Sequence, residues 1–267
     1  MIRTPAVAGQ FYPGSEEALV AEVESYLVPG AERKRALAVV CPHAGYVYSG
    51  HVAGAVFSSV EMPRRFVILC PNHTGMGAAA AILTGGAWSI PGAEVPVDEA
   101  LAGEIAGRCA AIEEDPLAHQ REHSLEVQLP FIVRLAKDPA FVPICLATRS
   151  FDALEEIGTA IAESIRSSGE DALIVASTDM SHYLPDETAR KIDRKAIDRI
   201  LELDPRGLLE TVERERISMC GAAPVAAALV AALELGAKEA ELVKYATSGD
   251  IFGDRSQVVG YAGIRVC

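Results

Sequence analysis

Two histidines follow two apolar runs of the sequence in matching positions. The run ALAVV at 36–40 leads into CPHAGYVYSG with His43, and FVILC at 66–70 leads into PNHTG with His73. Imidazole is the commonest metal ligand in proteins, so two neutral histidines on adjacent loops could bind one ion from neighbouring directions. A proline and a glycine flank each histidine and stiffen its loop, which suits a ligand that must stay in place.

A third apolar run, ALIVA at 172–176, leads into STDMSHY, which carries Asp179 and His182. Ligand sites of open α/β sheets collect outside the carboxyl ends of the strands, where the loops converge. We therefore expect the strand ends before His43, His73 and Asp179 to be neighbours in one parallel part of a sheet. For one histidine alone, a hydrogen-bonded loop residue is the commoner interpretation, but three in the same topological position favour a site.

Cys220 and the segment REHSLEVQLPF supply further candidates. Cys220 precedes a segment of small residues that predicts a helix, and a thiol near a helix N-terminus tends to ionise. A small buried apolar residue is an equally good interpretation of this cysteine. Glu122 and His123 are expected at the start of another helix, with Glu126 one turn on. They could serve as acid, base or partner of a ligand, or simply be solvated charges.

Several rival motifs fail or are absent. The stretch GMGAAA at 75–80 resembles the dinucleotide fingerprint, but the segment after it predicts a strand and not the required helix. The chain has no G-x-S-x-G elbow, P-loop or H-E-x-x-H motif. A hydrolase triad built from Ser177 or Ser181 with His182 and Asp179 stays open, although nothing supports an elbow there.

Strand-like and helix-like patterns alternate along the chain. Apolar runs of strand length occur at 37–41, 66–70, 79–83, 141–146, 172–176, 242–246 and 258–266. Helical patterns follow Ser15, Asp98 and Asp152, and also cover 187–203 and 221–235. Most of the apolar runs are continuous, as in strands covered on both faces. The order predicts one domain, 1–267, an α/β layered sandwich with a central mostly parallel or mixed sheet flanked by helices.

Composition excludes several classes of protein. The 267 residues carry 24 basic and 37 acidic side chains, a formal charge of -13, which would repel nucleic acid and anionic membranes. The longest apolar run, 225–233, is far shorter than the roughly 20 residues that span a bilayer. The N-terminus has no signal-peptide pattern, and the six scattered cysteines indicate a reduced protein without disulfides. We expect a cytoplasmic protein.

Five motifs in order, PHAGYVYSG, PNHTG, EHSLEVQLPF, STDMSH and MCG, closely resemble the Memo family, whose prokaryotic members are named AmmeMemoRadiSam system protein B. The similarity runs from AVAGQFYPG at 6–14 to the YAG near the end. It implies a fold similar to the class III extradiol, non-haem iron dioxygenases and a metal site of two histidines and a cysteine. The matching residues are His43, His73 and Cys220, with Asp179 and His182 nearby in the cleft.

The resemblance and the donor set predict a metal-dependent redox protein acting in the AmmeMemoRadiSam system, a non-haem metal oxidoreductase with a dioxygenase-like cleft. One ion is expected, with Fe(II) favoured and Cu or Zn as alternatives. His182 or His123 would move protons, with Glu122 as a further candidate, and Asp179 would orient a ligand or bind substrate.

The implied partners are an Amme-domain protein and a radical-SAM enzyme, besides a small-molecule or peptide substrate of unknown identity. Two alternatives remain. The chain could be a non-catalytic binding or scaffold protein that uses the old cleft for a partner or a redox metal, or it could be a metal-assisted hydrolase.

Overall fold

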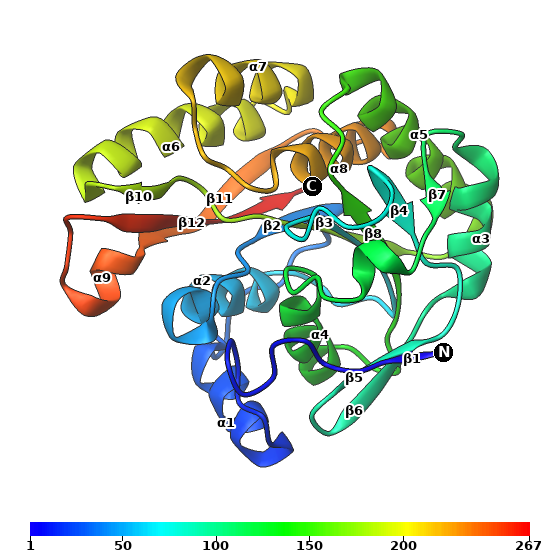
Figure 1. The fold of residues 1–267 in the computed structure, drawn as a ribbon, viewed down its shortest axis with the longest axis horizontal. Helices are drawn as coiled ribbons and strands as arrows, with labels where there is room; N and C mark the ends of the chain where they lie inside the picture. Colours follow the sequence, from blue (N-terminus) through cyan, green and yellow to red (C-terminus); the bar gives the residue numbers. More distant parts are fainter.

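A mixed nine-stranded sheet forms the centre of the protein (Figure 1). The computed structural model describes residues 1–267. The strand order is β10-β12-β2-β9-β3-β8-β4-β7, and β11 pairs with β12 in addition. The strands of this sheet are β2 (Ala38–Cys41), β3 (Arg65–Pro71), β4 (Ala80–Ile82), β7 (Glu113–Glu114), β8 (Ala140–Leu146), β9 (Ala172–Ser177), β10 (His182–Leu184), β11 (Ala240–Thr247) and β12 (Val258–Val266). A separate three-stranded sheet contains β1 (Ile2–Arg3), β5 (Ala87–Ile90) and β6 (Ala93–Pro96).

The four central strands, β2, β9, β3 and β8, run parallel. Every residue of β2, β3 and β9 is buried, as the continuous apolar runs predict for strands covered on both faces. Antiparallel neighbours, β12 beside β2 and β4 beside β8, flank this parallel part. Because β9 lies between β2 and β3, the strand ends before His43, His73 and Asp179 are neighbours, which confirms the sequence prediction.

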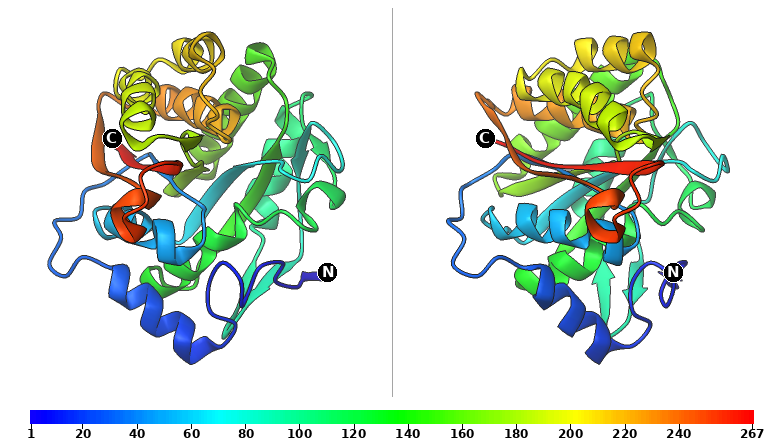
Figure 2. Two further views of the ribbon diagram at one scale, coloured as in Figure 1. Left: turned by 60° about the vertical axis from the view of Figure 1, so that its left-hand side comes forward. Right: turned by 90° about the vertical axis from the view of Figure 1, so that its left-hand side faces the viewer.

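Helices cover both faces of the sheet (Figures 1 and 2). The helices are α1 (Glu16–Tyr26), α2 (Tyr46–Ser58), α3 (Glu99–Arg108), α4 (Leu129–Leu135), α5 (Phe151–Ser168), α6 (Asp186–Leu201), α7 (Pro205–Glu215), α8 (Ala222–Glu234) and α9 (Ser248–Phe252). Two 3₁₀ turns, η1 (Leu117–His119) and η2 (Glu126–Gln128), precede α4. Helices α3 and α5 to α8 lie on one face, whereas α1, α2, α4 and the small sheet lie on the other.

The Ala-rich helix α8 packs directly on the central strands and against α5. A side chain at Gly158 of α5 would meet the carbonyl oxygen of Ala227 at 2.7 Å, so the two helices approach each other too closely for a Cβ atom. Both helices and the central strands contribute to a core of 70 buried residues. This dense layer fixes the sheet whose strand ends carry the candidate site.

The structure confirms most predicted elements and corrects some boundaries. All seven predicted strands are present, and the segment after GMGAAA is strand β4 as expected. Helix α5 begins two residues earlier than predicted, because the side chain of Ser150 and not that of Asp152 accepts its capping hydrogen bond. Glu122 and His123 are not at the start of a helix, because they lie in the irregular segment between η1 and η2. The described helices include none with the length and apolar character needed to cross a membrane.

Candidate metal centre

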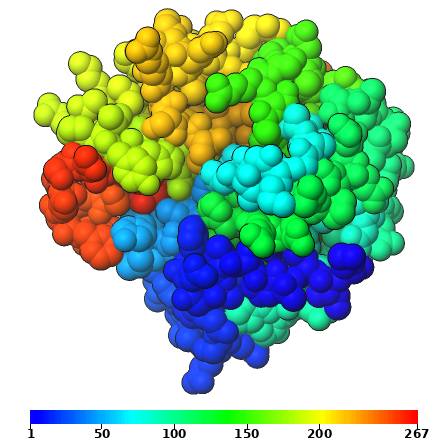
Figure 3. Space-filling model, in the orientation of Figure 1, coloured from blue at the N-terminus to red at the C-terminus, as the bar shows by residue number.

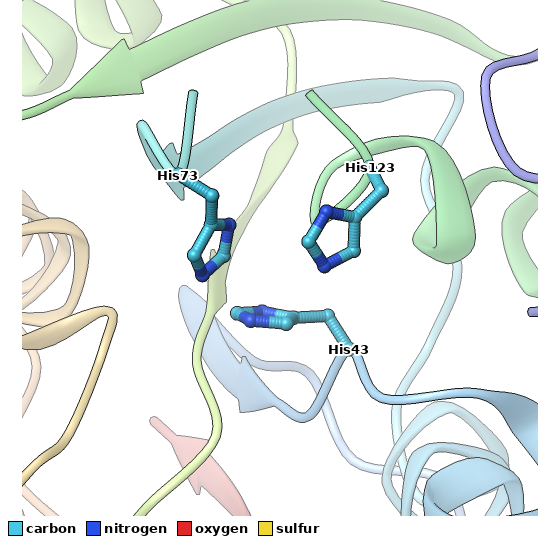
Figure 4. Close-up of side chains that lie close together, drawn as sticks. All are labelled: His43, His73 and His123. Atoms are coloured by element: carbon cyan, nitrogen blue, oxygen red, sulfur yellow. The ribbon is translucent and has the colours of Figure 1, made fainter. Parts of the chain in front are cut away.

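Three histidine rings converge at the carboxyl ends of the parallel strands (Figure 4). His43 follows β2, His73 follows β3, and His123 lies in the turn before η2. One ring nitrogen of each lies within 4.8 Å of the other two. The rings of His73 and His123 stack with centroids 4.7 Å apart, and the ring of His43 meets both of them edge-on. Imidazole nitrogens gathered in this way form a candidate metal centre.

The buried carboxylate of Glu122 orients His73. It accepts hydrogen bonds from the backbone N–H of His73 at 2.7 Å and from Nδ1 of the same ring at 2.9 Å. It also accepts from the backbone N–H of His123, and from the N–H and hydroxyl of Ser124 at 2.9 and 2.7 Å. An ionised carboxylate has no proton to donate, so Nδ1 of His73 carries one and Nε2 keeps its lone pair for a metal.

Glu122 is ionised despite its burial. Burial acts to raise the pKa of this carboxyl, but the hydrogen bond from His73 and the positive charge that its ring carries at low pH, together with the hydrogen bonds from Ser124, outweigh burial and lower the pKa to about 2. A buried carboxylate that accepts so many hydrogen bonds favours its charged form. The predicted role of Glu122 as a mobile acid or base therefore fits less well than the role of a fixed partner of His73.

Ser177, the last residue of β9, supports His43. Its Oγ lies 2.9 Å from Nδ1 of His43 and donates a hydrogen bond to the carbonyl oxygen of Ser124 at 2.6 Å. The side-chain amide of Gln128 donates to the same Oγ at 3.0 Å and to the carbonyl of Pro42 at 3.0 Å. Because His43, Ser177 and Gln128 are all buried, these bonds form away from competing water.

The cluster is open to solvent on the side of His73 and His123. The side chain of His43 is 3% exposed, against 32% for His73 and 21% for His123. Burial lowers the pKa of His43, and the neighbouring imidazoles lower it further. Burial also lowers the pKa of His123, while Glu122 acts in the opposite sense. Both rings are thus held neutral, the form in which histidine binds a metal.

Cys220 lies beside His43. Its Sγ is 3.2 Å from Nε2 of His43 and accepts a hydrogen bond from the backbone N–H of Asp179 at 3.3 Å. The cysteine precedes α8, as predicted, but burial first and the Asp179 carboxylate second raise the pKa of its thiol to about 12. The expectation of an easily ionised thiol is therefore wrong, because desolvation outweighs the helix N-terminus. The compact group contains His123, so the ligand role of Cys220 stays a prediction.

Asp179 and His182 occupy different surroundings. Asp179 accepts a hydrogen bond from the backbone N–H of His43 at 2.8 Å, and its other oxygen lies 4.0 Å from Nε2 of the same ring. Burial raises the pKa of Asp179 to about 6, although backbone hydrogen bonds from His43 and Ala44 oppose the shift. His182 opens β10, where Nδ1 donates to the carbonyl of Ser218 at 2.9 Å. Asp179 thus contacts a candidate ligand directly, and His182 keeps Nε2 free.

The hydrolase triad left open by the sequence is not assembled. The hydroxyl of Ser177 is fully buried and bonds toward His43, while the hydroxyl of Ser181 has no hydrogen-bond partner. Neither hydroxyl contacts His182, whose ring is held by Ser218. The structure therefore offers no activated serine nucleophile in this region.

The N-terminal residues hold the segment 122–128 in place. The guanidinium of Arg3 pairs with Glu126 at 2.6 Å and donates to the carbonyl oxygen of Glu122 at 2.6 Å. Glu126 is fully buried and also accepts a hydrogen bond from the hydroxyl of Tyr12 at 2.7 Å. Figure 3 shows the N-terminal residues, in dark blue, on the surface beside green segments from the middle of the chain. The start of the chain thus clamps the segment that supports the histidines.

Removing Arg3 should destabilise the protein strongly. Arg3→Ala leaves the buried carboxylate of Glu126 without its cation, and breaking a buried ion pair in this way costs about 3–5 kcal/mol. Urea unfolding followed by circular dichroism measures the change. Arg33→Ala, which removes an exposed arginine, is the matched control and should change stability by no more than about 0.5 kcal/mol. A loss at Arg3 no larger than that of the control would contradict the clamp.

The fold and the site together define the class: an α/β protein whose mixed sheet carries a histidine cluster at the carboxyl ends of its parallel strands. The family model described as Memo-like protein matches residues 3–265. The MEMO1 family protein MK0963 of Methanopyrus kandleri is 45% identical, and the alignment covers 99% of this chain and 98% of that protein. The MEMO1 family protein MTH_45 of Methanothermobacter thermautotrophicus is 42% identical, with 98% and 99% covered. The chain belongs to the Memo family, which confirms the resemblance of the five motifs.

A solved structure has a similar fold. The crystal structure of the uncharacterized protein JW3007 from Escherichia coli K12 matches with a TM-score of 0.56 at 11% identity, over 86% of this chain and all of that chain. At this identity the likeness concerns the fold alone. It agrees with the predicted α/β sandwich with a mixed central sheet.

Proposed function

We propose that the protein is a metal-dependent redox protein of the dioxygenase-like type, with Fe(II) as the favoured metal and copper or zinc as alternatives. The observation that carries the proposal is the convergence of His43, His73 and His123 at the strand ends. Three side chains from three separate segments place their nitrogens together, and buried side chains hold the rings of His43 and His73. A chance grouping of surface histidines would lack this support.

The residues present fit a metal ion. His43 and His73 would hold it, because the former is kept neutral and the latter has Nδ1 occupied by Glu122. Cys220 would be the third ligand by family resemblance, and its Sγ already lies 3.2 Å from Nε2 of His43. His123 would be a further ligand or a proton carrier, since its ring stacks on His73 at the open side.

When bound, an iron or copper ion in a site of nitrogen and sulfur ligands would supply redox chemistry and Lewis acidity toward a substrate oxygen. The protein's own residues have separate tasks. Asp179, whose pKa is about 6, can hold or release a proton beside His43 near neutral pH. His123 and His182 offer further proton carriers, and Glu122 keeps His73 oriented. The exposed edges of His73 and His123 admit a substrate from solvent.

Comparing two variants separates the ligand candidates. Cys220→Ser should weaken Zn(II) binding by about tenfold or more and Fe(II) binding less, because a hydroxyl replaces a soft thiolate. His123→Ala should leave that preference unchanged if His123 only moves protons. Anaerobic competition titrations against a chelator measure both metals, with Cys267→Ser as a control at a cysteine outside the site. Equal affinities of wild type and Cys220→Ser for both metals would exclude Cys220 as a ligand.

A further inference from the structure

We propose that Ser177 is a positioning residue that fixes the tautomer of His43 and thereby turns the lone pair of Nε2 toward the metal centre. The inference rests on the proposed function, since it takes His43 to be a metal ligand. Ser177 lies at the end of β9, and its side chain is fully buried. Its sequence position alone suggested only a nucleophile, a role that the structure does not support.

The argument starts from the single proton of the serine hydroxyl. Oγ of Ser177 has three neighbours: the carbonyl oxygen of Ser124 at 2.6 Å, Nδ1 of His43 at 2.9 Å and Nε2 of Gln128 at 3.0 Å. A carbonyl oxygen can only accept, so the hydroxyl proton goes to Ser124. An amide nitrogen can only donate, so Gln128 fills one lone pair of the hydroxyl. The other lone pair of Oγ faces Nδ1 of His43 and can only accept a hydrogen bond. Nδ1 must therefore be the protonated nitrogen of the ring.

The orientation of the Gln128 amide is itself determined by its neighbours. Its nitrogen donates to the carbonyl of Pro42 at 3.0 Å as well as to Ser177. Flipping the amide would place Oε1 against that carbonyl oxygen and lose both bonds, and Oε1 has no partner in its present position either. The two donor bonds therefore fix the amide, and the amide fixes the role of the hydroxyl.

The consequence is a ring that is ready for a metal. With Nδ1 protonated, Nε2 of His43 is the unprotonated nitrogen, and it is Nε2 that lies 3.2 Å from Sγ of Cys220. Glu122 sets His73 in the same tautomer through Nδ1. Glu122, Ser124 and Gln128 all belong to the segment 122–128, so one segment presets both rings through separate hydrogen bonds. No proton needs to move between ring nitrogens before a metal binds.

The tautomer can be measured directly in the metal-free protein. Long-range ¹H–¹⁵N correlation spectra of ¹⁵N-histidine-labelled protein show which ring nitrogen is protonated, and His43→Ala identifies the signals of His43. We expect the Nδ1–H form in the wild type. Ser177→Ala should give a substantial Nε2–H population, and Ser177→Thr, which keeps a hydroxyl, should restore the wild-type form. Ser164→Ala removes a buried hydroxyl without a partner in α5 and should change nothing.

Zinc titration of the same proteins gives the second readout. Loss of a partner that orients a ligand typically lowers metal affinity about 10–100-fold, so Ser177→Ala should bind Zn(II) at least tenfold more weakly, and Ser177→Thr should recover most of the loss. A wild-type His43 in the Nε2–H form would overturn the inference, and so would a Ser177→Ala protein whose tautomer is unchanged, whatever its affinity. If the tautomer responds as expected but the wild type binds no metal, the proposed function fails and the tautomer assignment stands.

Discussion

His43→Ala and His73→Ala should each remove most of the bound metal. Each variant deletes one proposed nitrogen ligand of the site, and the remaining rings cannot take its place, because they come from separate loops held by separate partners. We expect metal content below about one tenth of the wild-type value after purification and exposure to a chelator. Elemental analysis of anaerobically purified protein measures it.

The fold should survive both changes. His43 is buried, so its removal leaves Ser177 without one donor and costs about 1–3 kcal/mol, whereas the more exposed His73 should cost less. Far-ultraviolet circular dichroism checks that the variants are folded. His51→Ala, a histidine of α2 outside the cluster, is the control and should keep its metal. Full metal retention in both site variants would place the ion elsewhere.

Glu122→Gln should damage both metal affinity and stability. The two carboxylate oxygens accept five hydrogen bonds, and a glutamine would turn an amide N–H₂ toward one of these donors. We expect a loss of about 3 kcal/mol in the free energy of unfolding and about 10–100-fold weaker metal binding. Urea unfolding and chelator competition measure the two effects. Glu187→Gln on the exposed surface of α6 should change neither.

The same carboxylate predicts a pH dependence of the metal-free protein. The pKa of Glu122 is about 2 in the fold, against 4.5 for an unperturbed glutamate, so the folded state favours the ionised form. Its contribution to stability is fully present above about pH 4.5 and is lost as the pH falls toward 2. Unfolding free energies of wild type and Glu122→Gln should therefore converge in that window. Parallel curves from pH 5 to pH 2 would show that Glu122 is not the group responsible.

Sequence patterns were sufficient to predict the parallel strands at the centre of the fold. The runs at 37–41, 66–70 and 172–176 are apolar throughout because helices cover both faces of the sheet, and this burial leaves a clear signal. The short strands β1, β5 and β6 were not predicted. They are only two to four residues long, and β5 and β6 are partly exposed, so their composition does not distinguish them from loops.

From the sequence, only those site residues could be predicted that have a suitable residue type and directly follow a strand. His43 and His73 could be proposed because each follows a buried strand, and Asp179 for the same reason. The contact of His123 with them depends on how segment 122–128 folds over the sheet, and that segment is held by contacts such as the Arg3–Glu126 pair, which joins residues more than a hundred positions apart. Ser177 and Gln128 likewise come from distant segments and are joined by a buried hydrogen bond. No local sequence pattern predicts such a contact.

The measurement that tests the central claim most directly is the metal stoichiometry of the wild-type protein beside a His43→Ala, His73→Ala double variant. Both proteins would be purified anaerobically, incubated with Fe(II), passed over a chelating resin and analysed for metal per chain. We predict one ion per chain in the wild type and almost none in the double variant, with both proteins folded. Equal metal content in the two proteins, or none in the wild type with Fe(II), Cu(I) or Zn(II), would contradict a metal centre at these histidines.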